Sequence, residues 1–87
     1  MLMNNFKEEK VDISVVISCY NEEQFIIGTV ENVIGALNET GYRYEVIVMD
    51  DTSGDSSVEL VEKYIEKHPE YPLKLIVNSP NRGLAYI

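Results

Sequence analysis

Two adjacent carboxylates stand at the end of an apolar segment. Residues 46–49 are apolar without interruption, Asp50 and Asp51 follow them directly, and a polar turn at 52–57 comes next. Valine, isoleucine and methionine in one run suit a strand that is covered on both faces. In open α/β sheets, ligands bind outside the carboxyl ends of such strands. Asp50 and Asp51 therefore predict a ligand site at the mouth of a buried strand.

A second polar segment has the same relation to an earlier strand. Residues 15–17 form a β-branched cluster, which is typical of a short buried strand, and the polar residues 20–23 come soon after it. If the two strands are parallel, both polar loops meet at one edge of the sheet. The ring of Tyr20 offers a flat face for a base, the carboxylates accept hydrogen bonds from a base or from sugar hydroxyls, and Ser53 adds a small polar contact. A nucleotide fits this combination better than most ligands.

The elements that must position these loops alternate between strand and helix. Spacing of apolar residues by three and four predicts two amphipathic helices, and Ser56 with Glu59 predicts a capping box at the start of the second. We expect strands at 11–19, 44–49 and 73–77, helices at 22–40 and from 56 to Pro69, and the opening of a further helix at 84–87. Connections of this length imply parallel pairing with right-handed crossovers. The predicted fold class is α/β, a three-layer, mostly parallel sheet in the order β-α-β-α-β.

Length, charge and composition limit the function classes. A chain of 87 residues allows one small domain, which we place at 11–87, after a flexible leader at 1–10. A formal net charge of -8 argues against nucleic acid as a partner, because such binding rests on neutralising phosphates with Lys and Arg. No run approaches the roughly 18 apolar residues of a membrane span. A lone cysteine, Cys19, rules out an internal disulfide and favours a cytoplasmic location.

Three segments in this order resemble the successive N-terminal motifs of the family 2 glycosyltransferases. They are Val15-Val16-Ile17-Ser18-Cys19-Tyr20-Asn21-Glu22-Glu23, Val48-Met49-Asp50-Asp51-Thr52-Ser53-Gly54-Asp55-Ser56 and Asn81-Arg82-Gly83-Leu84-Ala85. The resemblance implies an inverting, metal-dependent enzyme with the A-type glycosyltransferase fold, which is Rossmann-like and binds nucleotides. The chain would then be a truncated half of that fold, and 11–87 a partial nucleotide-sugar-binding domain. The second motif departs from the common form, because Thr52 stands where glycine is usual.

The resemblance and the residue types together select a set of nucleotide-binding candidates. By the resemblance, Tyr20 lies against the base, Asp51 accepts a hydrogen bond from the base ring N–H, and Asp50 supports the turn and the ribose side. The serine after the first strand would also border the base, and the arginine and glycine of the third motif would border the sugar-phosphate. The full set is Ser18, Tyr20, Glu22, Asp50, Asp51, Ser53, Arg82 and Gly83.

The residues for catalysis are absent from this sequence. Family members hold a divalent metal with an Asp-x-Asp motif on a later strand and have their catalytic base further on. The 87 residues contain no Asp-x-Asp. We therefore predict no catalytic and no metal-binding residue here, and Mg²⁺ or Mn²⁺ only in the full-length enzyme. The predicted function is to supply the nucleotide-binding part of a glycosyltransferase that moves a sugar from a UDP-, GDP- or dTDP-linked donor, with no transfer by this chain alone. The full-length enzyme could associate with a membrane.

Other interpretations remain open at this point. The chain could be a non-catalytic nucleotide-binding or regulatory module, or an assembly fragment. Asp50 and Asp51 could be only a solvated turn, and Tyr20 could be a core aromatic residue. In the resembled fold the first strand lies inside the sheet, so its edge at 13–18 would be unpaired here, and an unpaired apolar edge invites another chain. We therefore expect the chain to form a homo-oligomer through that edge or through bare helix faces.

Overall fold

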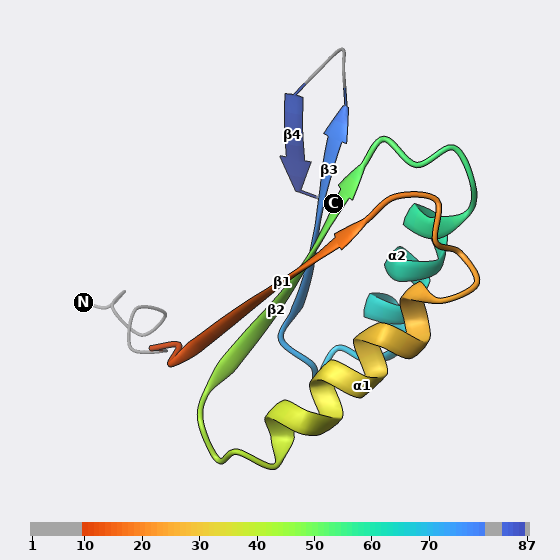
Figure 1. The fold of residues 1–87 in the computed structure, drawn as a ribbon. Coiled ribbons are helices and arrows are strands. Elements are labelled where there is room, and N and C mark those ends of the chain that lie inside the picture. The colour runs from red at the N-terminus through yellow and green to blue at the C-terminus, as the bar shows by residue number, and fades with distance from the viewer. Residues whose placement is uncertain (1–9, 80–82, 87) are drawn as a thin grey trace.

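One four-stranded sheet with two helices makes up the computed structural model, which describes residues 10–79 and 83–86 (Figure 1). Its elements are β1 (Ile13–Cys19), α1 (Ile26–Asn38), β2 (Tyr44–Asp51), α2 (Ser57–Lys67), β3 (Leu73–Ser79) and β4 (Gly83–Tyr86). The strand order is β1-β2-β3-β4, with β1, β2 and β3 parallel and β4 antiparallel to β3. The predicted α/β class with a mostly parallel sheet is confirmed.

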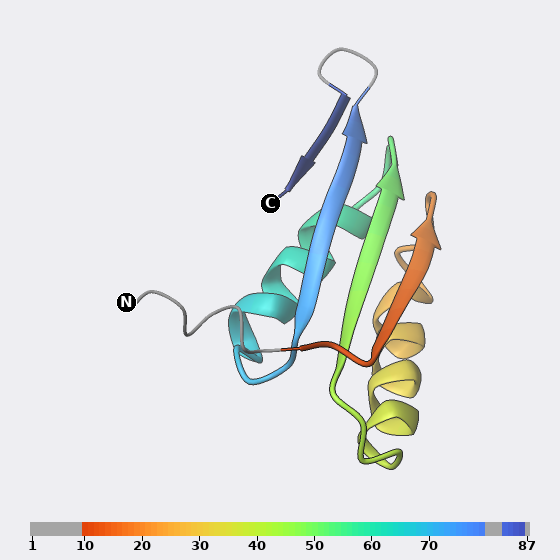
Figure 2. The ribbon, with the colours of Figure 1, turned by 90° about the vertical axis from the view of Figure 1, so that its left-hand side faces the viewer.

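Both helices cover the same face of the sheet, as the two views show (Figures 1 and 2). The described residues therefore form two of the three expected layers. The strand order explains this arrangement, because the sheet grows in one direction from β1 to β3. Successive crossovers of one hand then place their helices on one side.

The core lies between the helices and alternate residues of the strands. Val46 and Val48 of β2 are fully buried beneath Val30 of α1 and Val61 of α2. Side chains along a strand alternate between faces, so every second residue points to the face that the helices leave open. On that face Val16 of β1 is 54% exposed. The core thus lies on the helix face, whereas the open face is mixed: Ile76 of β3, which lies on it opposite Met49, is only 8% exposed.

Three local expectations are wrong. The helix expected at 84–87 is absent from its described residues, 84–86: 83–86 form β4, which gains a backbone partner in β3 through the pairs from Ser79↔Gly83 to Ile76↔Tyr86. α1 begins at Ile26, because the residues before it are engaged by the loop after β2. Ser56 makes no side-chain cap bond at the start of α2. The Asp55 carboxylate takes that place and accepts the Ser57 N–H at 2.9 Å.

The remaining structural expectations concern the chain ends and the sheet edge. The predicted leader, apart from its last residue, lies outside the described residues. Within the described sheet, β1 is an edge strand, as expected. In residues 10–79 and 83–86, no helix is long and apolar enough to cross a membrane.

Candidate functional site

The loops after β1 and β2 are joined by hydrogen bonds from backbone to side chain. The backbone N–H of Asn21 donates to the Ser53 hydroxyl at 2.8 Å, and the Asn21 side-chain carbonyl accepts from the Gly54 N–H at 2.7 Å. The Glu22 N–H donates to the buried Ser57 hydroxyl at 2.9 Å. These exchanges satisfy backbone groups that would otherwise need water. The two loops, 20–25 and 52–56, therefore form one unit, which we call the loop clasp.

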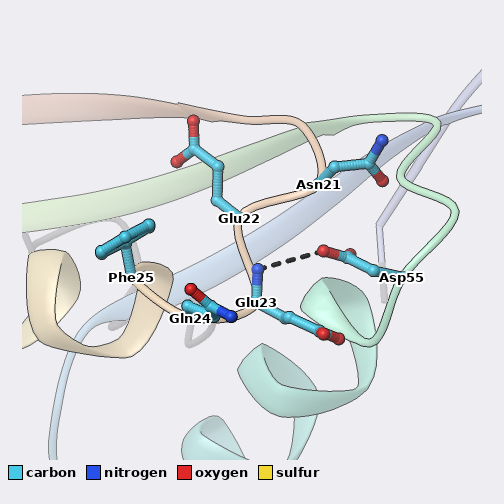
Figure 3. A pocket seen from close by; sticks show the side chains of 6 residues that line it. All are labelled: Asn21, Glu22, Glu23, Gln24, Phe25 and Asp55. Carbon is cyan, nitrogen blue, oxygen red and sulfur yellow. Dashed lines mark hydrogen bonds between the residues drawn. The ribbon is translucent and has the colours of Figure 1, made fainter.

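Two carboxylates complete the loop clasp, and Figure 3 shows them from close by. Asp55 accepts from the Glu23 N–H at 3.1 Å, and Glu23 in return accepts from the Ser56 N–H at 2.9 Å. The Ser57 hydroxyl, which donates to Asp55 at 2.6 Å, holds the pKa of Asp55 below its ordinary range. A hollow of about 150 Å³ lies beside these groups, and the Glu22 carboxylate points away from the pair (Figure 3). The carboxylates of Asp55 and Glu23 therefore hold the two loops together.

Asp50 supports the turn from inside the protein. It is the last residue of β2 to face the helices, and it is only 1% exposed. Its Oδ2 accepts from the Ser53 N–H at 2.9 Å, and its Oδ1 accepts from the Ser53 hydroxyl at 2.5 Å. This burial excludes the interpretation of Asp50 as a solvated residue. Both oxygens are engaged within the fold, so Asp50 holds the turn at Ser53.

A larger hollow of about 390 Å³ opens over the carboxyl ends of the strands, on the face without helices. Residues from β1, β2, β3 and the first loop line it: Ser18, Cys19, Tyr20, Glu22, Met49, Asp51 and Asn78. The parallel register explains the convergence, since Ser18 lies opposite Met49 and Asp51 lies opposite Asn78. Its volume falls within the range of small-molecule sites, roughly 300–1,000 Å³.

The structure brings together half of the predicted site residues. Four of the eight line the larger hollow: Ser18, Tyr20, Glu22 and Asp51. Asp50 and Ser53 lie behind it and shape the turn. Gly83 belongs to β4, where it pairs with Ser79, and Arg82 lies outside the described residues.

The groups around the larger hollow suit a flat, polar ligand. Tyr20 is 59% exposed, which excludes a role as a core aromatic residue and leaves its ring free to stack. The exposed Asp51 carboxylate can accept hydrogen bonds, and its Oδ1 already accepts from the Asn78 side-chain amide at 2.9 Å. Ser18 adds a hydroxyl, and Met49 adds apolar surface. The hollow therefore combines a stacking surface with an anionic acceptor.

The described residues do not fit a metal ion or a reactive thiolate. Among residues 10–79 and 83–86, no three His, Cys, Asp or Glu side chains gather closely enough to hold a metal. Asp50 and Asp51 are neighbours on β2, so their side chains point to opposite faces and cannot share one cation. Burial raises the pKa of the Cys19 thiol, which favours the neutral form.

Besides Cys19, which lines the larger hollow but was not among the predicted site residues, two lining residues were missed by the sequence reasoning. Met49 lies two residues before Asp51 on the same strand, so strand alternation alone places both on one face. Asn78 follows the apolar part of β3, and its place beside Asp51 depends on the register between β2 and β3. Met49 could have been found from the sequence, whereas Asn78 required the pairing between β2 and β3.

Comparisons with known proteins agree with this architecture. The profile described as Glycosyl transferase family 2 matches residues 14–86. A dolichyl-phosphate beta-glucosyltransferase from Dictyostelium discoideum is 35% identical in an alignment over 80 residues. The match covers 86% of this chain and 24% of that protein. An undecaprenyl-phosphate 4-deoxy-4-formamido-L-arabinose transferase from Proteus mirabilis is 32% identical over 71 residues, 80% of this chain and 22% of that protein.

A solved structure is similar as well. The mannosyltransferase from Pyrobaculum calidifontis, in complex with GDP-Man and Mn²⁺, superposes with a TM-score of 0.65 at 30% identity and covers 82% of this chain and 20% of that chain. The chain thus spans about a quarter or less of the length of the relatives that it matches. The family profile covers most of the sequence, and the fold agrees with it. The chain belongs to glycosyl transferase family 2.

Proposed function

We propose that this chain forms the nucleotide-binding part of an enzyme that transfers a sugar from a nucleotide-sugar donor to an acceptor. The observation that carries the proposal is the larger hollow, where Ser18, Tyr20 and Asp51 converge over the strand ends. The similar mannosyltransferase, which was solved with GDP-Man, adds support for a nucleotide sugar as the ligand. UDP-, GDP- and dTDP-linked sugars are the candidate donors.

In this proposal each of the eight predicted site residues has a defined task. The base stacks on the exposed ring of Tyr20 and donates its ring N–H to the Asp51 carboxylate. Ser18 borders the base, and Glu22, on the same rim, accepts from a ribose hydroxyl. Asp50 acts indirectly, through the turn at Ser53. We assign Arg82 and Gly83 to the border of the sugar-phosphate region.

We further propose that the complete enzyme uses Mg²⁺ or Mn²⁺ and that the chain alone does not transfer sugar. Mn²⁺ in the similar mannosyltransferase supports the use of a divalent metal. The residues described here do not gather into a metal site, so the metal ligands would come from elsewhere in the enzyme. The acidic character of the chain, with a net charge of -8, repels a diphosphate unless a cation offsets it. We place the enzyme in the cytoplasm, with a membrane association of the complete protein.

Self-association of the chain is a further part of the proposal. β1 is an edge strand of the described sheet and presents the exposed Val16 on the open face. Unpaired strand edges of this kind accept another strand. Sedimentation at increasing concentration should reveal dimers or larger species. A single monomeric species at high concentration would contradict self-association but not nucleotide binding.

Titration calorimetry tests the central part of the proposal. UDP, GDP and dTDP are each titrated into the chain with and without Mn²⁺. We expect at least one nucleotide to bind, more weakly than drug-sized ligands in closed pockets, because the hollow is open at the sheet edge. Failure of all three nucleotides to bind under both conditions would refute nucleotide binding and favour an assembly role. Turnover of a sugar nucleotide by the chain would refute the claim that it is inactive alone.

A further inference from the structure

Asn78 lies directly opposite Asp51 across the pairing between β2 and β3. Its Nδ2 donates to the Asp51 Oδ1 at 2.9 Å. Because a carboxylate can only accept, the amide must present its NH₂ group here and not its carbonyl. Both side chains line the larger hollow. This hydrogen bond therefore orients a group at the surface of the proposed base site.

Few other contacts fix the Asp51 carboxylate. Asp51 is exposed, and its second side-chain contact within the described residues is the Thr52 hydroxyl, at 3.4 Å from the same Oδ1. A contact of that length is weak for a hydroxyl donor. Both contacts reach Oδ1, so in the described part of the chain Oδ2 keeps its lone pairs for a ligand. The direction in which Oδ2 points depends chiefly on Asn78.

We propose that Asn78 is a positioning residue for base recognition, which holds the Asp51 carboxylate so that Oδ2 accepts the ring N–H of a base. This inference rests on the proposed nucleotide function. The ligands that it favours are bases with a ring N–H, namely uracil, thymine and guanine. Adenine and cytosine lack that hydrogen in their common forms and gain nothing from the arrangement. Asn78 itself need not touch the nucleotide.

A chemical double-mutant cycle tests the coupling between Asn78 and the base N–H. UDP and N3-methyl-UDP, which lacks the ring N–H, are titrated into the wild-type chain and the Asn78→Ala variant. We expect Asn78→Ala to weaken UDP binding by about fivefold, because the Asp51 carboxylate loses the hydrogen bond that orients it toward the base. N3-methyl-UDP should bind the two proteins equally. If GDP is the tighter ligand, GDP and N1-methyl-GDP replace the uridine pair.

The outcomes separate this inference from the proposed function. Equal weakening of UDP and N3-methyl-UDP, or no weakening of UDP, overturns the positioning role and leaves nucleotide binding intact. A wild-type chain that binds none of UDP, GDP and dTDP, with or without Mn²⁺, overturns both. Lys74→Ala serves as the matched control, because Lys74 also contacts a carboxylate across the same strand pair, Glu45, but lies outside the lining of the hollow. This control should bind UDP like the wild type.

A second variant keeps the test decisive if alanine disturbs the strand. Asn78→Asp preserves the shape but sets two carboxylates face to face, which favours sharing of one proton as the pH falls. We expect Asn78→Asp to bind UDP much more weakly than the wild type at pH 8. The difference in affinity between the two proteins should shrink as the pH falls from 8 to 5. A gap that stays constant over this range would indicate a purely structural role and overturn the inference. Heteronuclear NMR spectra establish that each variant is folded.

Discussion

Thr52 offers a sharp test of how the turn after β2 is built, because its backbone has φ of 60°. A non-glycine residue in this left-handed region is disfavoured by roughly 1–2 kcal/mol, and a β-branched one more than most. Thr52→Gly removes that strain but gives the unfolded chain about 0.5–1 kcal/mol of additional entropy. Thr52 is exposed, and among the described residues its hydroxyl contacts only Asp51, at 3.4 Å, so little packing is lost. We therefore expect a net stabilisation of about 1 kcal/mol, or roughly 5 °C in Tm for a domain of this size.

Urea and thermal denaturation followed by circular dichroism measure the change. Thr52→Ala is the first control, since it removes the branch and the hydroxyl but keeps a Cβ in the left-handed region, and it should gain much less. Asn21→Gly is the second, because Asn21 also has positive φ, of 50°, but its side chain accepts the Gly54 N–H. We expect this control to lose stability. If Thr52→Gly is neutral or destabilising, or Thr52→Ala matches it, backbone strain at Thr52 is the wrong explanation.

Three further substitutions test the helix, the buried carboxylate and the loop clasp. Gly35→Ala should raise the free energy of unfolding in urea by about 0.5–1 kcal/mol, because a Cβ there meets no described atom within 4 Å and alanine favours the helix. A lower free energy of unfolding would contradict the exposed position of Gly35 in α1. Asp50→Ala should cost about 2 kcal/mol, since it leaves the N–H and hydroxyl of Ser53 without their acceptor, and Asp50→Asn should cost less; equal losses would argue against this role. The lowered pKa of Asp55 means that its stabilising contribution is present above the ordinary carboxyl value near 4 and is lost as the pH falls through the lower folded value. The urea midpoint should therefore drop in acid, and Asp55→Asn should reduce that drop; an unchanged pH profile would refute it.

Much of the architecture could be predicted from local sequence patterns. The β-branched run before Cys19 and the apolar run before Asp50 specify two strands, and the long connection between them specifies parallel pairing. Parallel pairing then sets the loops of Tyr20 and Asp51 at one edge, which is why these two residues could be placed at the hollow from residue order alone. The elements predicted best are those whose pattern is long and periodic.

The details that failed depend on contacts distant in sequence. The predicted capping box at Ser56 does not form, and Asp55 caps the helix instead, because its carboxylate accepts from the N–H of Glu23 in the first loop and from the N–H of Ser57 at the start of α2. β4 has too few residues to show a period, and its identity as a strand comes from pairing with β3. Asp50 and Asp51 look equivalent in the sequence, but strand alternation sends one into the core and the other to the hollow. The cap at Asp55 and the pairing of β4 depend on contacts between segments, which no local pattern specifies.

The central claim is that the Asp51 carboxylate accepts a hydrogen bond from a nucleotide base in the hollow over the strand ends. The most direct measurement is the dissociation constant of the best-bound nucleoside diphosphate, by calorimetry, for the wild type, Asp51→Ala and Glu66→Ala. Glu66 is an exposed carboxylate on α2 outside the lining of the hollow, so Glu66→Ala controls for the change in net charge. Loss of a charge-assisted hydrogen bond of about 1.5 kcal/mol predicts roughly tenfold weaker binding for Asp51→Ala and little change for Glu66→Ala. Equal affinity of Asp51→Ala and the wild type would contradict the claim.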